Sequence, residues 1–203
     1  MSRRSPTPMS TRRAKRPNGT AERILDIAER LVQTRGFNNF SYADIAGELG
    51  ITTASLHYHF RGKAELGQAL VNRYAERFTD SLEQIDRDLS DPRAKLDAYA
   101  RLYAGVLEGK RMCMCGVLAA EYQTLPKPMR TAVIRFFDDN QRWLTTVLAQ
   151  GKTDQTLAFS GSPDDVAQSI LSTLEGAMLV ARPYDSLAKF NSTAHRLLAS
   201  LAN

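Results

Sequence analysis

The sequence predicts an all-α protein of about nine helices, with a three-helix unit near the N-terminal end and a larger helical region after it. Three observations support this prediction. Apolar residues recur at three- and four-residue spacing along most of the chain, which is the period of an amphipathic helix. Capping residues and Pro precede several of these segments, and Gly follows others. No segment alternates as a half-buried strand does, and no segment repeats another.

The first helix is expected to run from Thr20 to Gly36. Its apolar side chains repeat with helical spacing and form a stripe that needs a partner. These side chains are Ile24, Ile27, Ala28, Leu31 and Val32. Gly36 can end the helix in the left-handed conformation, and Phe37 and Phe40 follow it as apolar residues. We expect them to complete a three-helix core with the next segment.

Residues 41–63 read as two short helices joined by a tight turn, which is a helix-turn-helix. Ser41 can cap the first of these helices together with Asp44, in a variant of the capping box. Gly50 stands where a helix ends with positive φ. Thr52 can then cap the second helix.

The outer face of the second short helix carries the chemistry of this region. Leu56 and Phe60 are four residues apart and share the inward side, which leaves hydroxyl, imidazole and phenol groups outside. Such groups bond to base edges and phosphate oxygens in DNA. We expect base contacts from Thr53, Ser55, His57 and Tyr58, and phosphate contacts from Thr52, His59 and Lys63. The alternative is a helical hairpin whose aromatic outer face packs on protein.

This stretch resembles the DNA-binding motif of the TetR/AcrR family of bacterial transcription regulators. The residues that carry the resemblance are Gly36-Phe37, Ile45-Ala46, Gly50-Ile51-Thr52, Leu56-His57-Tyr58-His59-Phe60, Lys63 and Glu65-Leu66. His57 departs from the family pattern, which commonly has Tyr there, and this affects the base preference expected at that contact. The resemblance implies a regulator in which an effector bound in the C-terminal region changes the separation of two DNA-reading units and releases the DNA.

A single three-helix unit reaches only one half of a DNA site, so specific binding requires two units at a fixed separation. We therefore expect a homodimer on a palindromic, double-stranded operator. The resemblance implies that the last two helices, at about residues 163–182 and 186–202, form a four-helix bundle with those of the partner. Small residues in this region would allow close packing between subunits, and burial within one subunit is the alternative. They are Ser169, Ser172, Thr173, Gly176 and Ala177.

The chain divides into an arm at residues 1–19, a DNA-binding domain at 20–66 and an effector-binding and dimerisation domain at 67–203. Helices in the last domain are expected at about 63–85, 91–109, 113–124, 127–149, 163–182 and 186–201. It carries more aromatic and sulfur side chains than a spacer needs, which is typical of small-molecule pockets, although core packing explains many of them equally well. The pocket candidates are Tyr103, Cys113, Glu121, Tyr122, Phe136, Asn140, Trp143 and Met178.

Cys113 and Cys115 are the only thiols, and their default state in a reducing compartment is buried and reduced. The alternative is a redox- or electrophile-sensing repressor. In that case Lys110, Arg111 and the amides of a helix N-terminus would lower a thiol pKa. The two thiols and two histidines do not form a metal-ligand set, because the histidines diverge on their helix.

The net charge of +5 is placed unevenly, since residues 1–19 hold six basic and no acidic side chains. This polar arm is expected to be disordered, either in contact with phosphates or as a solubilising tail. A non-specific architectural DNA-binding protein is therefore an alternative function. No apolar run is long enough to span a membrane and no signal peptide is visible, which predicts a cytoplasmic protein. No catalytic constellation, phosphate loop or cofactor motif appears, so we expect no enzyme.

Overall fold

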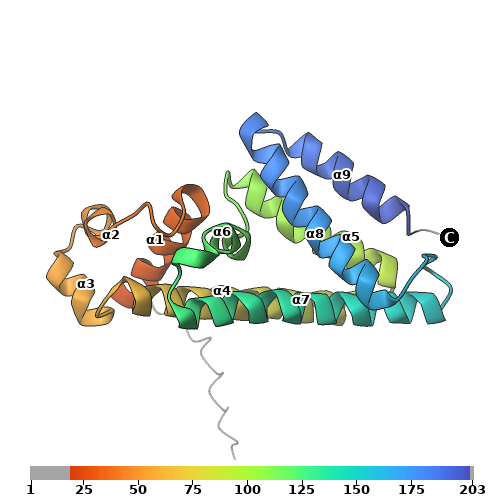
Figure 1. The fold of residues 1–203 in the computed structure, drawn as a ribbon, viewed down its shortest axis with the longest axis horizontal. Helices are drawn as coiled ribbons and strands as arrows, with labels where there is room; N and C mark the ends of the chain where they lie inside the picture. Colours follow the sequence, from red (N-terminus) through yellow and green to blue (C-terminus); the bar gives the residue numbers. More distant parts are fainter. Residues whose placement is uncertain (1–18, 202–203) are drawn as a thin grey trace, which may run out of the picture.

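The computed structural model describes residues 19–201 (Figure 1). Over these residues the chain forms nine α-helices and no β-strand, which confirms the predicted fold class. The helices are α1 (Thr20–Arg35), α2 (Tyr42–Leu49), α3 (Thr53–His59), α4 (Lys63–Asp88), α5 (Pro92–Glu108), α6 (Met114–Ala120), α7 (Lys127–Thr153), α8 (Pro163–Ala181) and α9 (Leu187–Ala199), with 3-10 helices η1 (Tyr122–Thr124) and η2 (Arg182–Tyr184). Residues 1–18 of the predicted arm lie outside the described part of the chain. None of the helices described is long and apolar enough to cross a membrane.

Helices α1, α2 and α3 pack around a small apolar core at one end of the molecule (Figure 1). Ile24, Leu31, Ile45 and Leu56 are buried at its centre. They come from all three helices, so each helix presents one apolar stripe to the other two. This arrangement confirms the predicted three-helix core.

Local capping contacts set the boundaries of the two short helices. Both halves of the Ser41–Asp44 capping box are formed at the start of α2. Gly50 ends α2 in the left-handed conformation, with φ 67°. The Thr52 hydroxyl then accepts a hydrogen bond from the Ser55 amide at 3.1 Å and caps α3. The sequence-based helix-turn-helix is therefore present as predicted.

Helix α4 continues from the three-helix unit along the body of the protein, and α7 runs beside it (Figure 1). Helix α4 ends at Asp88 rather than near Ile85 as predicted. Residues 86–88 carry no apolar side chain, and Leu89, which continues the apolar spacing from Ile85, lies just after the helix. Instead, the Asp86 carboxylate in that turn accepts hydrogen bonds from Lys95 at 2.7 Å and from Trp143 at 2.8 Å. Tertiary contacts thus favour a helical turn that local sequence does not predict.

Helix α6 is shorter than the predicted helix at residues 113–124, because it ends at Ala120. The Glu121 carboxylate (Oε2) accepts a hydrogen bond at 2.8 Å from the Phe37 amide in the loop after α1. Residues Tyr122–Thr124 then form the separate turn η1. A residue that the prediction placed inside a helix instead bonds the body of the protein to the three-helix unit.

The three-helix unit is also held to the body by a nearly buried arginine on α4. The Arg73 guanidinium lies 2.8 Å from the Asp26 carboxylate and 2.9 Å from that of Glu29, both on α1. One to two turns further along the same side of α1, the Gln33 amide donates a hydrogen bond to the Met112 carbonyl at 3.0 Å. Charge-assisted bonds to a side chain that is only 10% exposed are among the stronger polar contacts. They orient α1 relative to the body.

Candidate nucleic-acid interface and ligand cavity

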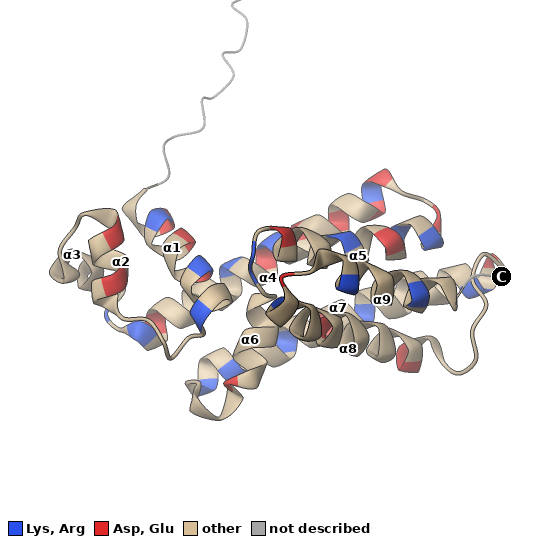
Figure 2. Ribbon diagram, turned by 90° about the horizontal axis from the view of Figure 1, so that it is seen from above, with Lys and Arg blue, Asp and Glu red and all other residues tan. Residues whose placement is uncertain are grey.

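Helix α3 turns its apolar side chains inward and its polar side chains outward, as predicted. Leu56 is fully buried and Phe60 is 8% exposed, whereas Tyr58 is 86% exposed. Thr53 is exposed and Ser55 is half-buried. The helix carries no Lys, Arg, Asp or Glu and is uniformly tan in Figure 2. Its outer surface can therefore form hydrogen bonds without strong charge of its own.

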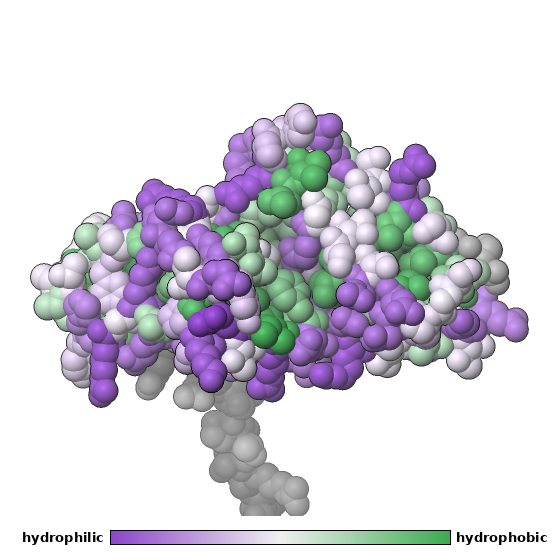
Figure 3. Space-filling view, viewed as in Figure 1, coloured by the Kyte–Doolittle hydropathy of each residue, from purple (hydrophilic) through white to green (hydrophobic). Residues whose placement is uncertain are grey.

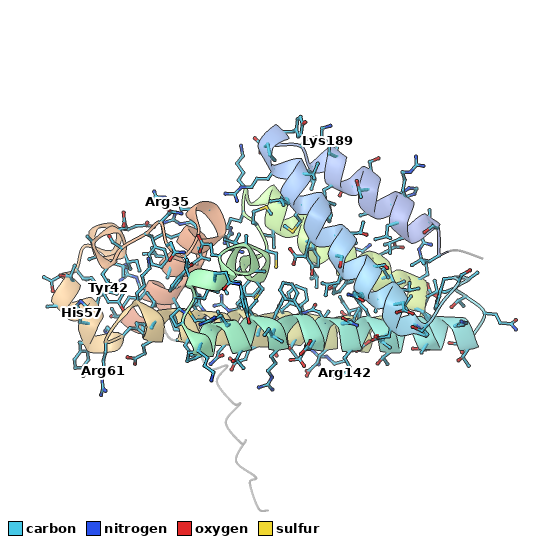
Figure 4. All side chains as sticks on the ribbon, viewed as in Figure 1. Arg35, Tyr42, His57, Arg61, Arg142 and Lys189 are labelled. Atoms are coloured by element: carbon cyan, nitrogen blue, oxygen red, sulfur yellow. The ribbon has the colours of Figure 1, made fainter. Side chains whose placement is uncertain are left out.

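The His57 ring is held in place from two sides. It lies against the Tyr42 ring, with centroids 4.7 Å apart, and its Nδ1 is 3.2 Å from the Arg61 carbonyl (Figure 4). A carbonyl oxygen only accepts, so Nδ1 must carry the hydrogen in this contact. The neutral ring then offers Nε2 as an acceptor. His57 is thus suited to accept a hydrogen bond from a base amino group rather than to donate one to a phosphate.

The Lys63 ammonium does not extend freely from the surface as a phosphate-binding group would. It donates a hydrogen bond to the Phe40 carbonyl and lies 4.3 Å from the centre of the Phe40 ring. Burial lowers the pKa of Lys63 from its usual value. Arg61, which the sequence-based list omits, projects from the turn after α3 with an exposed side chain (Figure 4). The sequence does contain a signal for Arg61, namely a basic residue just after the second helix of the helix-turn-helix. Thr52 is exposed at the start of α3 and His59 is half-buried at its end.

A cavity of about 620 Å³ lies between the C-terminal end of α1 and helices α6, α7 and α8. Most of its wall is apolar, with side chains such as Val117, Phe137 and Leu171. Figure 3 shows hydrophobic surface in the hollow between α6 and α8. Polar side chains also border it, among them the acids Glu121 and Glu175 and the amides of Gln141 and Gln168. This size and composition are typical of pockets for small organic molecules.

Of the eight pocket candidates named from the sequence, Glu121 lines this cavity. Tyr122 lies near Arg130, and Trp143 packs on Tyr99 and bonds to Asp86 on another side of the body. The remaining five are buried in the core around α4, α5, α7 and α8: Tyr103, Cys113, Phe136, Asn140 and Met178. Helical periodicity identifies inward-facing residues, but it does not show which of them border empty space.

Among the polar residues of the cavity that sequence reasoning missed, Glu175 is the acidic one. It extends from α8 towards α6 and accepts a hydrogen bond from the Cys113 thiol. Its other carboxylate oxygen, Oε1, is buried and has no hydrogen-bond partner among the described residues. Burial raises the pKa of Glu175 to about 7. An acid within a mostly apolar helix pattern was the only available sequence signal.

The thiols do not have the environment expected of redox sensors. Cys113 and Cys115 are both free and buried, and burial raises the pKa of each well above its usual value. The expectation that Lys110 and Arg111 lower a thiol pKa is wrong. Lys110 instead pairs with Asp185 at the surface, at 2.8 Å, and Arg111 lies 3.5 Å from the Gln33 side chain. Neither cation offsets the cost of placing a thiolate in the core.

Comparison with known proteins agrees with a DNA-reading unit followed by a ligand-binding helical body. Residues 24–70 match bacterial regulatory proteins of the tetR family, and residues 92–197 match the tetracyclin repressor-like C-terminal domain. The transcriptional regulator AcuR of Cereibacter sphaeroides is 28% identical over 171 residues, which are 80% of this chain and 77% of that protein. The HTH-type transcriptional repressor NemR of Escherichia coli is 27% identical over 188 residues, 87% of this chain and 91% of that protein. The crystal structure of a TetR-family transcriptional regulator from Agrobacterium tumefaciens has a TM-score of 0.87 and 32% identity, and covers 90% of this chain and 97% of that chain.

The outward face of α3 and the cavity in the helical body together define a ligand-responsive, DNA-binding transcriptional regulator of the helix-turn-helix class. Two family matches, one to the three-helix unit and one to the helical body, identify the family within this class. The chain belongs to the TetR family of bacterial regulatory proteins.

Proposed function

We propose that the protein is a dimeric repressor that places α3 of each subunit in the major groove of a palindromic operator. In this proposal Thr53, Ser55, His57 and Tyr58 contact bases. Thr52 and His59 hold phosphates, with Lys63 joining them if its ammonium leaves the Phe40 carbonyl. The observation that carries the proposal is the outward face of α3, where the exposed phenol of Tyr58 lies among hydroxyl and imidazole groups.

The experiment that tests DNA reading is selection of bound fragments from a random DNA pool. We expect two half-sites related by symmetry and separated by about one helical turn or a multiple of it. Specific fragments should bind about 10³-fold or more tightly than random DNA at the same salt concentration. Equal affinity for all fragments would instead favour a non-specific architectural role.

Dimerisation through α8 and α9 is supported by exposed apolar side chains at the C-terminal end of α8. Leu179, Val180 and Tyr184 are 64%, 63% and 64% exposed. Hydrophobic surface over this end of α8 is visible in Figure 3. An exposed apolar cluster of this kind is typical of interaction surfaces, which supports a subunit interface here. The small residues Ser172 and Gly176 on the same helix are also exposed, but they line the cavity, as does Leu179, so Val180 and Tyr184 carry the support for this interface.

A surface substitution separates dimerisation from folding. We expect Val180→Glu to shift the protein from dimer to monomer in light scattering at micromolar concentration, because it places a charge in the apolar interface. Ile134→Glu is the matched control, since Ile134 is an exposed apolar residue of α7, 48% exposed and outside the proposed interface. If both variants stay dimeric, the interface is elsewhere.

The effector role of the cavity is supported by its position against the DNA-reading unit. Its lining includes Gly36 at the end of α1 and Glu121, whose carboxylate bonds to the Phe37 amide. Arg182, also in the lining, donates a hydrogen bond to the Thr34 carbonyl at 2.6 Å. A ligand that fills the cavity thus meets the groups that connect α1 to the body. We infer that such a ligand changes the separation of the two α3 helices and releases the operator.

A further inference from the structure

The wall of the cavity contains an acidic side chain, Glu175, that packs against a glycine on the facing helix. Glu175 lies on α8 and its carboxylate reaches the surface of α6 at Gly116. A methyl group added at Gly116 would overlap the Glu175 Oε2 atom. The absence of a side chain at position 116 therefore makes the space that this carboxylate occupies.

The carboxylate is incompletely paired within the described residues. One oxygen accepts a hydrogen bond from the Cys113 thiol, which is a weak donor. The other, Oε1, is buried and has no partner among the described residues. Glu175 takes part in none of the ion pairs found between residues 19 and 201. A buried polar atom without a partner costs free energy that a bound group can recover.

Within residues 19–201, no positive side chain reaches this part of the cavity. The two arginines in the lining, Arg35 and Arg182, are exposed, and their guanidinium groups lie near Asp44 and the Thr34 carbonyl. The titratable groups nearer to Glu175 are the thiols before and within α6 and the tyrosines of α5. Each has a raised pKa and stays uncharged near neutral pH: Cys113, Cys115, Tyr99 and Tyr103. Glu121 is the other acid of the lining, and no histidine lines the cavity. Among the described residues, the surroundings therefore offer apolar contact and the uncharged polar side chains of Gln141, Gln168 and Ser172, but no counter-ion.

We propose that the cavity binds an amphipathic organic cation, whose apolar body fills the space between α6, α7 and α8 and whose protonated nitrogen donates to the free Glu175 oxygen. This inference rests on the proposed role of the cavity as the effector site and names the chemical class of the effector. A cation supplies the charge and the hydrogen bond that the carboxylate lacks. An anionic head group would face an acid in a low-dielectric wall.

The proposal fixes the sign of the pH dependence. Burial holds the pKa of Glu175 at about 7, so the carboxyl is partly protonated at neutral pH. An aliphatic amine keeps its proton up to about pH 9 and pairs with the ionised form of Glu175. Affinity should therefore rise as pH increases through about 7 and then level off. A ligand that accepts a hydrogen bond from the protonated carboxyl would show the opposite trend.

Three probes with one apolar body and different head groups test the proposal. They are naphthylmethylamine, naphthylmethanol and naphthoate, titrated into the full-length protein by calorimetry at about pH 8. We expect the amine to bind about tenfold or more tightly than the alcohol, and naphthoate to bind most weakly, because a charge-assisted hydrogen bond is about twice as strong as a neutral one. Equal affinities, or tighter binding of the alcohol or naphthoate, would overturn the proposal.

Two substitutions test whether Glu175 causes the preference for the amine probe. Glu175→Gln should remove the advantage of the amine over the alcohol, and Glu83→Gln, an exposed acid of α4, is the matched control. Gly116→Ala should also weaken amine binding, because the added methyl group displaces the carboxylate. Circular dichroism checks that each variant is folded. An unchanged amine preference in folded Glu175→Gln contradicts the assignment.

The same probes added to the protein–operator complex distinguish failure of this inference from failure of the proposed function. Amine binding that leaves the operator bound would contradict the effector role and still support the Glu175 site. Operator release by compounds that compete for the cavity, with no binding of the amine, would support the effector role and overturn the cation assignment. Amine binding with operator release, lost together in Glu175→Gln, supports both.

Discussion

The three-helix unit and the helical body direct their working side chains in opposite ways. In the unit, a small closed core holds α3 and the polar side chains point outward, with Tyr58 86% exposed. In the body, helices leave a cavity of about 620 Å³ that the Glu121 and Glu175 side chains border. The first surface is made by one short helix and can be changed without disturbing the core. The second needs several helices, so its chemistry depends on how they pack.

Leu56→Ala should have the largest effect and tests whether the two regions can be separated. The fully buried side chain closes the core of the three-helix unit, and its loss should destabilise the protein by about 3 kcal/mol. Chemical denaturation measures this change, and a gel-shift assay should show operator binding lost. Ligand binding in the body should persist if the regions are separable. Loss of both activities together would mean that the unit and the body unfold as one.

Glu175→Gln should have the next largest effect, with a sign that depends on pH. The pKa of Glu175 is raised from 4.5 to about 7 in the folded protein. The unfolded state therefore loses the proton first, and wild-type stability falls as pH rises between these values. The variant lacks this loss, so relative to wild type it should gain roughly 2 kcal/mol from about pH 5 to about pH 8. Thermal unfolding at both pH values measures it, and a pH-independent difference would contradict the buried charge.

Tyr58→Ala tests the outward surface alone. We expect operator affinity to fall by about tenfold, because one base contact is worth about 1–3 kcal/mol. The free energy of unfolding should change by no more than about 0.5 kcal/mol, since the side chain is exposed. Gel-shift titration and denaturation of the same preparation give the two values. Unchanged affinity would count against α3 as the reading helix.

Cys113→Ser should have the smallest effect. The thiolate is the reactive form, and burial raises the pKa of Cys113. We expect iodoacetamide to label the native protein at least about tenfold more slowly than the unfolded chain at neutral pH. Operator release by an added quinone should be the same in the variant and the wild type. A response present in the wild type and absent in the variant would instead support the thiol-sensing alternative.

The three-helix unit and the helical body also differ in how far the sequence predicts them. The caps Ser41 and Thr52, the turn at Gly50 and the inward pair Leu56 and Phe60 act within a few residues of each other, so α2, α3 and the outward face could be derived from the sequence. Their contacts with DNA remain predictions.

The cavity could not be derived in this way. Its acidic wall depends on Glu175 packing against Gly116, and these residues lie on two helices that are far apart in the chain. The end of α6 was misplaced for a similar reason, because the Glu121 carboxylate is used by the Phe37 amide. Helical periodicity records which side of a helix is buried, but it carries no information about the gap that remains after packing.

The bond between the Phe37 amide and Glu121 makes one backbone proton a reporter of the state of the cavity. This amide lies in the loop after α1, while its acceptor belongs to the cavity wall. A compound that draws the carboxylate away would leave the amide open to solvent and speed its exchange with deuterium. Magnetic resonance at this single position could therefore detect ligand occupancy inside the body from within the DNA-reading unit.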